Sequence, residues 1–464
     1  MTDKIYKRPV TPVERYLAHS PYSIVAMVAR IKGAVTASLL GHAVAKVQQR
    51  HPNLRVRIED GEDGPWFTSE EVGEIPIEVV PRTSADRWIQ VYHEACRVPF
   101  EFDRRPAIRF YLVQSDAESE LMVFCHHLIC DGLSLAYLAR DLMAHLGDPT
   151  REVEVLPDPV PIGLDNMPDE MSMPGIAKFF VKRINDKWEP ERISFDQQDY
   201  EDLNQAYWAR YTHQMLPVEL SEAQTTALVQ RCRAENVTVN SALTAAFVAA
   251  QVLVLGDDPD LRKVFVGVSL RERLPHSPGE AMGFYAGAAQ LKFKVNARKG
   301  FWDNARLFHR KIKPRYADKL LFQDPLAWCH LDPSILEAIH FKRLGGLVPA
   351  HASRYSKLSA FSRRDDTVSG VLKREGIDSM EKKSLGTAMT NLTRMDFPRQ
   401  YGALELDRLI MNPGGAFPLA TVNLVVGAVT CCGKLSLLLE YAEQAVESPA
   451  VERVRDKALA LLIE

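Results

Sequence analysis

Two adjacent histidines and an aspartate stand close together in one short stretch, His126-His127-Leu128-Ile129-Cys130-Asp131-Gly132. An imidazole exchanges protons near neutral pH, so a histidine here suits general-base catalysis. Histidine and aspartate are also metal ligands, and a site made of His126, His127 and Asp131 is a second interpretation. The third interpretation is a pair of buried histidines with no catalytic or metal-binding role.

The elements around this stretch favour the first interpretation. The apolar run Leu121–His127 predicts a strand that is buried on both faces, and Asp131-Gly132 is a turn signal. A helix is predicted next, from the spacing of Leu135, Leu138, Ala139, Leu142 and Met143. Neighbouring side chains on a strand point to opposite faces, so His126 and His127 cannot both serve one small site. We therefore expect one catalytic histidine, one histidine held by packing or a structural hydrogen bond, and no metal.

Composition narrows the class of protein. The 464 residues are 46% hydrophobic and 25% charged with a net charge of -3, which argues against a general nucleic-acid binder. The start of the chain has no apolar signal region, and no apolar run approaches the roughly 20 residues that a membrane-spanning helix needs. The seven cysteines have no framework spacing, which fits free thiols in the cytoplasm.

The pattern HHxxxDG formed by residues 126–132 is the signature of a known superfamily. The chain resembles the thioester-dependent acyltransferases related to chloramphenicol acetyltransferase, which include nonribosomal peptide condensation domains and polyketide-associated acyltransferases. The segments TPVERYL, SLLGHAVAKVQQRHPNLRVRI and PFEFDRRPAIRFYLV are similar to elements of condensation domains. The resemblance implies an α/β fold of two sandwich lobes with mixed sheets and an active-site channel between them.

The resemblance also assigns roles to residues. It implies that His127 is the general base, while His126, Asp131 and Gly132 are structural. In this superfamily the motif aspartate pairs with an arginine; Arg271 is the match here and Arg273 the runner-up. No metal and no permanently bound cofactor are implied, because the acyl thioester is itself a substrate.

Alternating helix and strand patterns suggest a division into three parts. We expect an N-terminal lobe at 1–150, a crossover linker at 151–205 and a C-terminal lobe at 206–464. The linker is rich in proline and acidic residues and too broken for one regular element, and a helix is expected within residues 175–187.

The second lobe yields three further expectations. The charged stretch 353–383 reads as a long loop, and residues 301–321 read as one helix. The strand around Thr390-Asn391-Leu392 resembles one that crosses to the first lobe's sheet in relatives. Asn391 is either a channel residue or an ordinary asparagine at a sheet end, and the second interpretation is favoured.

The motifs of other enzyme classes fail on inspection. No GxSxG, GxGxxG or complete phosphate-binding loop occurs, and His93-Glu94 lacks the second histidine of a zincin helix. The superfamily's DFGWG element is also missing, and residues 396–402 are only a weak echo of it. That departure leaves the subfamily open.

We expect an acyltransferase that moves an acyl group from coenzyme A or a carrier-protein phosphopantetheine to a hydroxyl acceptor, giving an ester in secondary or lipid metabolism. A histidine base serves an alcohol well, since an alcohol is a poor nucleophile until its proton is taken. Two alternatives remain: a free-standing condensation enzyme that acylates an amine to form an amide, and a non-catalytic relative that docks an acyl or peptidyl carrier protein.

Overall fold

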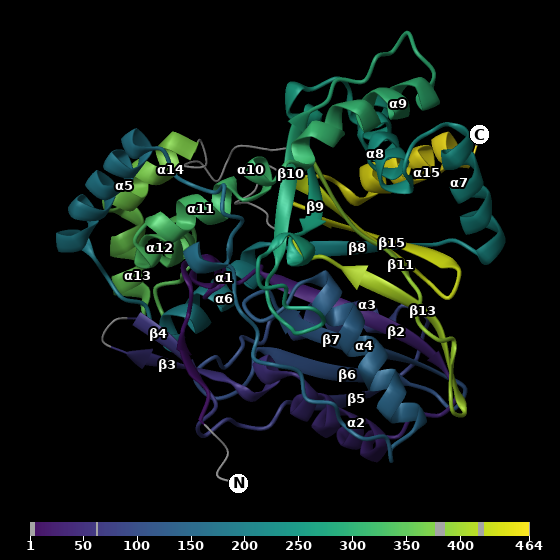
Figure 1. Cartoon of the computed structure of the whole chain (residues 1–464), viewed down its shortest axis with the longest axis horizontal. Helices are drawn as coiled ribbons and strands as arrows, with labels where there is room; N and C mark the ends of the chain where they lie inside the picture. Colours follow the sequence, from purple (N-terminus) through teal and green to yellow (C-terminus); the bar gives the residue numbers. More distant parts are fainter. Residues whose placement is uncertain (1–4, 62–63, 376–385, 416–421, 464) are drawn as a thin grey trace.

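The computed structural model describes residues 5–61, 64–375, 386–415 and 422–463. Within these residues the strands form two six-stranded sheets and one three-stranded sheet. In Figure 1 the two large sheets lie one above the other, and each carries helices on its outer side. The predicted α/β class with two mixed sheets is confirmed.

The first large sheet is built around the strand that carries the histidine motif. Its spatial order is β12 Gln400–Tyr401, β13 Leu404–Asn412, β2 Ile24–Lys32, β7 Glu118–His126, β6 Ile108–Gln114 and β5 Ile77–Pro81. Only the β5–β6 pair is parallel. The helices of this part of the chain are α2 Ala37–Arg50, α3 Arg87–Cys96 and α4 Gly132–Gly147.

The second large sheet comes from the later part of the chain. Its order is β10 Ala286–Lys292, β9 Lys263–Ser269, β11 Gly386–Met395, β14 Val422–Cys431, β15 Lys434–Ala442 and β8 His213–Glu219. Strand β11 runs parallel to both of its neighbours, and the other pairs are antiparallel. The helices at this sheet in Figure 1 are α7 Glu222–Ala234, α8 Val239–Leu255, α9 Phe301–Ile312 and α15 Ser448–Ile463.

The remaining elements gather at the side of the two large sheets (Figure 1). The small sheet contains β1 Lys7–Pro9, β4 Gly64–Thr68 and β3 Arg57–Gly61. The helices in this group are α1 Pro12–Leu17, α5 Gly175–Trp188, α6 Gln197–Arg210, α10 Asp318–Leu321, α11 Gln323–His330, α12 Pro333–Leu344, α13 Tyr355–Arg363 and α14 Thr367–Glu375.

One predicted crossing strand is wrong. The strand that contains Asn391 is β11, and it stays in the second sheet between β9 and β14. Strands β12 and β13 are the ones that join the first sheet, where β13 pairs with β2 along most of its length. The weak echo at residues 396–402 contains β12 and leads into β13, so the crossing lies one strand later in the chain than the resemblance suggested.

Three other expectations about local structure need correction. The stretch 353–383 is not one loop, because α13 and α14 occupy much of it; residues 376–383 lie outside the described residues. Its charges cover one face, while Leu358, Phe361, Val368 and Leu372 bury the other at helical spacing. The expected helix at 301–321 is interrupted by a 3₁₀ turn at Lys313–Tyr316, where Pro314 has no amide hydrogen to donate. The expected linker contains α5 as predicted but also α6, and its division from the lobes at residues 150 and 205 stays a prediction.

Candidate active site

The histidine motif lies at a tight corner between β7 and α4. Strand β7 ends at His126, and the next amide, that of His127, still donates to the carbonyl of Ser23 at 2.8 Å. The chain then turns through Cys130 and enters α4 at Gly132, with Asp131 as the N-cap. The predicted order of buried strand, turn and helix is confirmed.

His126 faces the interior of the first lobe. Its side chain is fully buried and packs edge-on against Phe102, with ring centroids 5.0 Å apart. Nε2 donates to the carbonyl of Ser20 at 2.9 Å, and Nδ1 accepts from the amide of Leu128 at 3.2 Å. Both ring nitrogens are therefore used by the neutral imidazole, and burial lowers the pKa of His126 to about 3. These contacts fit the structural role expected of it.

His127 faces the opposite way, into a pocket. Both ring nitrogens face a carbonyl oxygen: Nδ1 lies 3.1 Å from that of Cys130, and Nε2 lies 3.3 Å from that of Pro413. A neutral ring can donate to only one of them, and the shorter contact favours the hydrogen on Nδ1, which leaves the lone pair on Nε2. Burial lowers the pKa of His127 and keeps the ring neutral near pH 7. This arrangement provides a proton acceptor at the pocket wall.

Asp131 and Arg271 form the ion pair that the resemblance implied. Nη2 of Arg271 lies 3.0 and 3.1 Å from the two carboxylate oxygens, and both side chains are buried. Nη1 of Arg271 donates to the carbonyls of Gly279 and Ala281. The runner-up, Arg273, binds the backbone of Tyr316 and pairs with Asp318 instead. The Asp131–Arg271 pair thus ties the histidine corner of the first lobe to the chain that follows β9.

Two residues that the sequence analysis did not single out complete this junction. The Oγ of Ser134 lies within hydrogen-bond distance of Asp131, of Arg271 Nη2 at 2.8 Å and of the carbonyl of Gly283. The amide of Tyr285 donates to Asp131 at 3.2 Å, and its ring lies over the Arg271 guanidinium at 4.8 Å. A serine three positions after an N-cap aspartate is a capping-box signal that could have identified Ser134.

Gly132 is the first residue of α4 and lies where two side chains approach. A Cβ there would meet Leu392 and Met411 at 2.9 Å each. Both of these side chains line the pocket, so any larger residue at this position would push atoms into it. The glycine therefore keeps this part of the pocket open beside His127.

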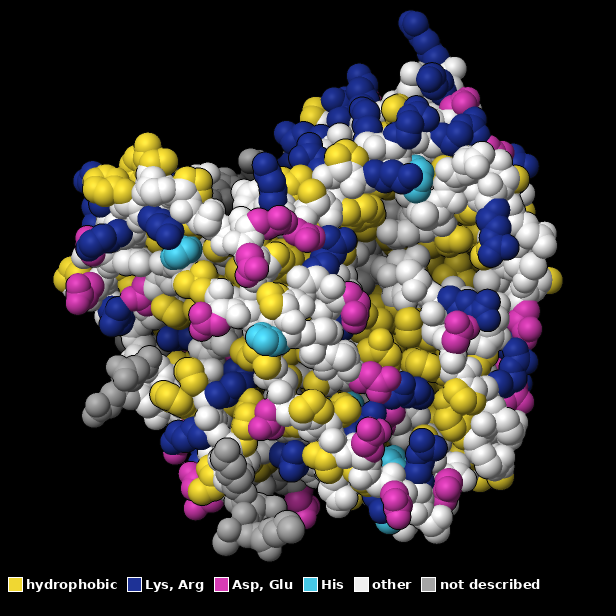
Figure 2. All heavy atoms as spheres, viewed as in Figure 1, with side chains coloured by type: hydrophobic (Ala, Val, Ile, Leu, Met, Phe, Trp, Pro, Cys, Tyr) yellow, Lys and Arg dark blue, Asp and Glu magenta, His cyan; other side chains and the backbone are white. Residues whose placement is uncertain are grey.

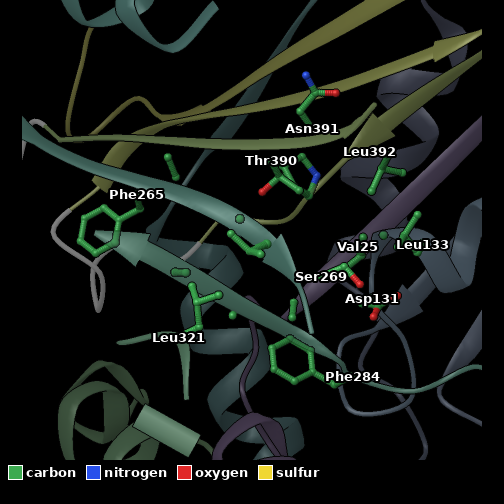
Figure 3. A pocket seen from close by; sticks show the side chains of 18 of the residues that line it. Val25, Asp131, Leu133, Phe265, Ser269, Phe284, Leu321, Thr390, Asn391 and Leu392 are labelled. Atoms are coloured by element: carbon green, nitrogen blue, oxygen red, sulfur yellow. The ribbon is translucent and has the colours of Figure 1, made fainter. Parts of the chain in front are cut away.

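The pocket that His127 faces has a volume of about 800 Å³ and draws its walls from both parts of the chain. The first part contributes Val25, Asp131, Gly132, Leu133 and Tyr137, and the second part contributes residues of β9, β10, β11, α10 and α11. Phe284 packs edge-on against the His127 ring, with centroids 5.4 Å apart. Figure 3 shows the pocket running from Asp131 and Phe284 at one end to Phe265 at the other.

Asn391 lines this pocket, but its amide group serves the backbone. Its Oδ1 accepts from the amide of Thr393 at 2.7 Å, and Thr393 has a positive φ of 63°. The side chain therefore stabilises the irregular end of β11, and in Figure 3 it points away from the labelled residues around Asp131. Asn391 therefore lies in the pocket wall, at a register irregularity of β11, and its role in the channel stays a prediction.

Other features bear on cofactors and membranes. Among the residues that the structure describes, no group of three or more His, Cys, Asp or Glu side chains could hold a metal ion. All seven cysteines are free thiols. No single helix within the described ranges is long and apolar enough to cross a membrane, although α7 and α8 together meet the length and composition criteria across a 95° bend.

Two family models match the chain, one in each part. Residues 11–152 match the condensation domain, and residues 211–330 match the C-terminus of phthiocerol/phthiodiolone dimycocerosyl transferase. The isonitrile lipopeptide synthase of Mycobacterium tuberculosis is 31% identical over 130 residues, which cover 27% of this chain and 5% of the synthase. The nonribosomal peptide synthetase kk1B of Curvularia clavata is 24% identical over 304 residues, which cover 62% of this chain and 2% of that protein. The chain thus spans only a small part of these curated relatives.

Solved structures with the same fold cover nearly the whole chain. Polyketide synthase associated protein 5 from Mycobacterium tuberculosis superposes with a TM-score of 0.57 at 16% identity, covering 98% of both chains. The trichothecene 15-O-acetyltransferase TRI3 from Fusarium sporotrichioides has a TM-score of 0.64 at 11% identity, covering 100% of this chain and 96% of its own. Together with the two family models, this shared fold confirms the resemblance to condensation domains and polyketide-associated acyltransferases.

Proposed function

We propose that the protein transfers an acyl group from a thioester to a hydroxyl acceptor, with His127 as the general base. The observation that carries this proposal is the orientation of the ring. Its Nδ1 is held by the Cys130 carbonyl, which leaves the Nε2 lone pair at the wall of an 800 Å³ pocket. A neutral imidazole in this position can accept the proton of an acceptor hydroxyl.

In this mechanism the acceptor oxygen attacks the thioester carbonyl while its proton moves to Nε2 of His127. The carbonyl π electrons move to oxygen, and the N-terminus of α4 opens on the pocket at Gly132 and Leu133, where first-turn amides favour negative charge. The C–S bond then breaks, and Nε2 returns its proton to the departing thiolate. While the ring is charged, the Pro413 carbonyl at 3.3 Å is an acceptor for Nε2–H.

A strongly basic surface supports a donor that carries phosphate. Residues 292–319 contain ten Lys and Arg against two Asp, and Figure 2 shows dark blue side chains gathered over this region, at α9. None of the exposed members forms an ion pair with another described residue; they are Lys292, Lys294, Arg298, Lys299, Arg310, Lys311, Lys313, Arg315 and Lys319. The same segment supplies Tyr316 to the pocket wall. Coenzyme A and a carrier-bound phosphopantetheine both meet this charge requirement.

Amide formation is the second candidate. The segment that carries His127 matches the condensation-domain model, and the relative kk1B is a nonribosomal peptide synthetase by name. A third candidate, a relative that only docks carrier-bound intermediates, predicts binding without turnover.

The test offers alcohol and amine acceptors together with several acyl thioesters, on both coenzyme A and a carrier protein, and identifies products by mass spectrometry. Ester products support the proposal. Amide products alone would transfer the assignment to the second candidate. Binding of the donors without any product would favour the docking relative.

A further inference from the structure

One arm of the pocket runs along a single face of the second sheet. Ser269, Gly267 and Phe265 alternate along β9 and therefore point to the same side. Their directly paired neighbours on the edge strand β10 are Ala286, Ala288 and Gln290, and Ala388 of β11 pairs with Phe265. Paired residues share a face of the sheet. Except for Gln290, all of these residues line the pocket.

The side chains along this face are small until Phe265. The side chains here project little from the sheet, so an extended chain can lie directly on its surface; the residues are Gly267, Ala286, Ala288 and Ala388. A Cβ on Gly267 would meet Thr390 at 3.0 Å, so there is no spare room for a larger residue there. We name this face, formed by Gly267, Ala286, Ala288 and Ala388, the small-residue track.

Phe265 ends the track at the side far from the catalytic corner. Figure 3 shows its ring at the opposite end of the pocket from Val25, Leu133 and Asp131, with Leu321 between it and Phe284. Phe265 lies four residue steps before Ser269 along β9, which is about 13 Å of extended strand. An extended substrate that starts near Phe284 therefore reaches Phe265 only if it is long.

We propose that the small-residue track binds the acyl chain of the thioester and that Phe265 sets the longest chain accepted. This inference rests on the acyl transfer proposed above. An acyl chain needs no hydrogen-bond partners, and the middle of the track offers only alanine, glycine and the Thr390 hydroxyl. The pantetheine arm contains amide groups, which would lose hydrogen bonds on such a surface.

The experiment measures binding without turnover. S-alkyl coenzyme A thioethers, from methyl to tetradecyl, are titrated into the full chain by calorimetry. We expect the affinity to rise by up to about fourfold per methylene while the chain lies on the track, and then to stop rising. The edge strand leaves Ala288 exposed, so the gain per methylene is an upper value.

Two variants should change, in opposite directions, the chain length at which the affinity stops rising. Phe265→Ala should shift it to longer chains, and Ala288→Leu should shift it to shorter ones. Phe179→Ala is the matched control, because Phe179 is an exposed aromatic on α5 outside the pocket, 56% accessible. It should leave the series unchanged. Phe265→Leu, a milder change, replaces Phe265→Ala if the latter does not fold.

Two outcomes would overturn the inference. If Phe265→Ala and Ala288→Leu change the affinity of every thioether by the same factor, including the methyl compound, the track holds the pantetheine arm. If neither variant changes the series, the track holds no part of the donor. Failure of the proposed function is a separate result, because it would show as no ester or amide product while the affinity still stops rising at the same chain length.

Discussion

Replacing Asp131 with alanine should destabilise the protein strongly, because it removes the partner of a buried charge. The carboxylate accepts from the Ser134 amide at 2.7 Å, from the Tyr285 amide at 3.2 Å and from Arg271 at 3.0 and 3.1 Å. Leaving a buried ion-pair partner uncompensated costs about 3–5 kcal/mol. Loss of the N-cap alone would cost about 1 kcal/mol. Arg271 keeps its hydrogen bonds to two backbone carbonyls in the variant. We therefore expect the free energy of unfolding to fall by about 3–5 kcal/mol in total.

The assay is urea unfolding followed by circular dichroism, with kcat/KM measured on the same preparations. Asp131→Asn keeps an oxygen for the cap but loses the charge, so its free energy of unfolding should lie between those of the wild type and Asp131→Ala. Asp186→Ala is the control: Asp186 pairs with Lys182 at 2.8 Å on the exposed face of α5, and such pairs are worth about 0–1 kcal/mol. If Asp131→Ala were as stable as Asp186→Ala yet inactive, Asp131 would act in the chemistry and the structural account would be wrong.

Three further predictions test other parts of the site. The pKa of His126 falls to about 3 on folding, so on acidification the unfolded chain binds a proton before the folded chain does. The free energy of unfolding should therefore decline as the pH falls from about 6.5 toward 3. His126→Gln should make that decline smaller in acid-unfolding curves. Gly132→Ala should lower kcat/KM more than the melting temperature, because its Cβ meets the ends of flexible side chains that line the pocket. Gly147→Ala should do the reverse, because its Cβ falls 2.6 Å from the Tyr401 backbone; equal effects of the two variants on both measurements would contradict this. Asn391→Ala should cost about 1 kcal/mol of stability by releasing the Thr393 amide, and a large loss of activity at unchanged stability would instead make Asn391 a substrate contact.

The strand, turn and helix around the motif could be predicted because local signals agree there. The apolar run of β7, the Asp131-Gly132 turn signal and the helical spacing of α4 follow one another in the order that the structure shows. The alternation of side chains along a strand also predicted that His126 and His127 point to opposite faces. The class of fold and the Asp131–Arg271 pair came from the resemblance rather than from the residues alone.

Long-range pairing was harder to predict. Nothing local to β11 or β13 indicates which of them pairs with β2, since both are apolar strands of similar length. The many charged residues at 353–375 hid two amphipathic helices from sequence reasoning, because only two apolar residues are buried in each helix. The pocket walls come from segments more than 200 residues apart, so the small-residue track and Phe265 had no signal in sequence order.

His127→Ala tests the central claim most directly. The rate of acyl transfer from a coenzyme A or carrier thioester to an alcohol is measured for wild type and variant at pH 7, after circular dichroism has shown that both are folded. With His127 as the general base, the variant should lose about a hundredfold to ten-thousandfold in kcat. The wild-type rate should also fall on acidification with an apparent pKa below the ordinary histidine value, because burial lowers the pKa of His127. Ester formed by His127→Ala at the wild-type rate would contradict the account.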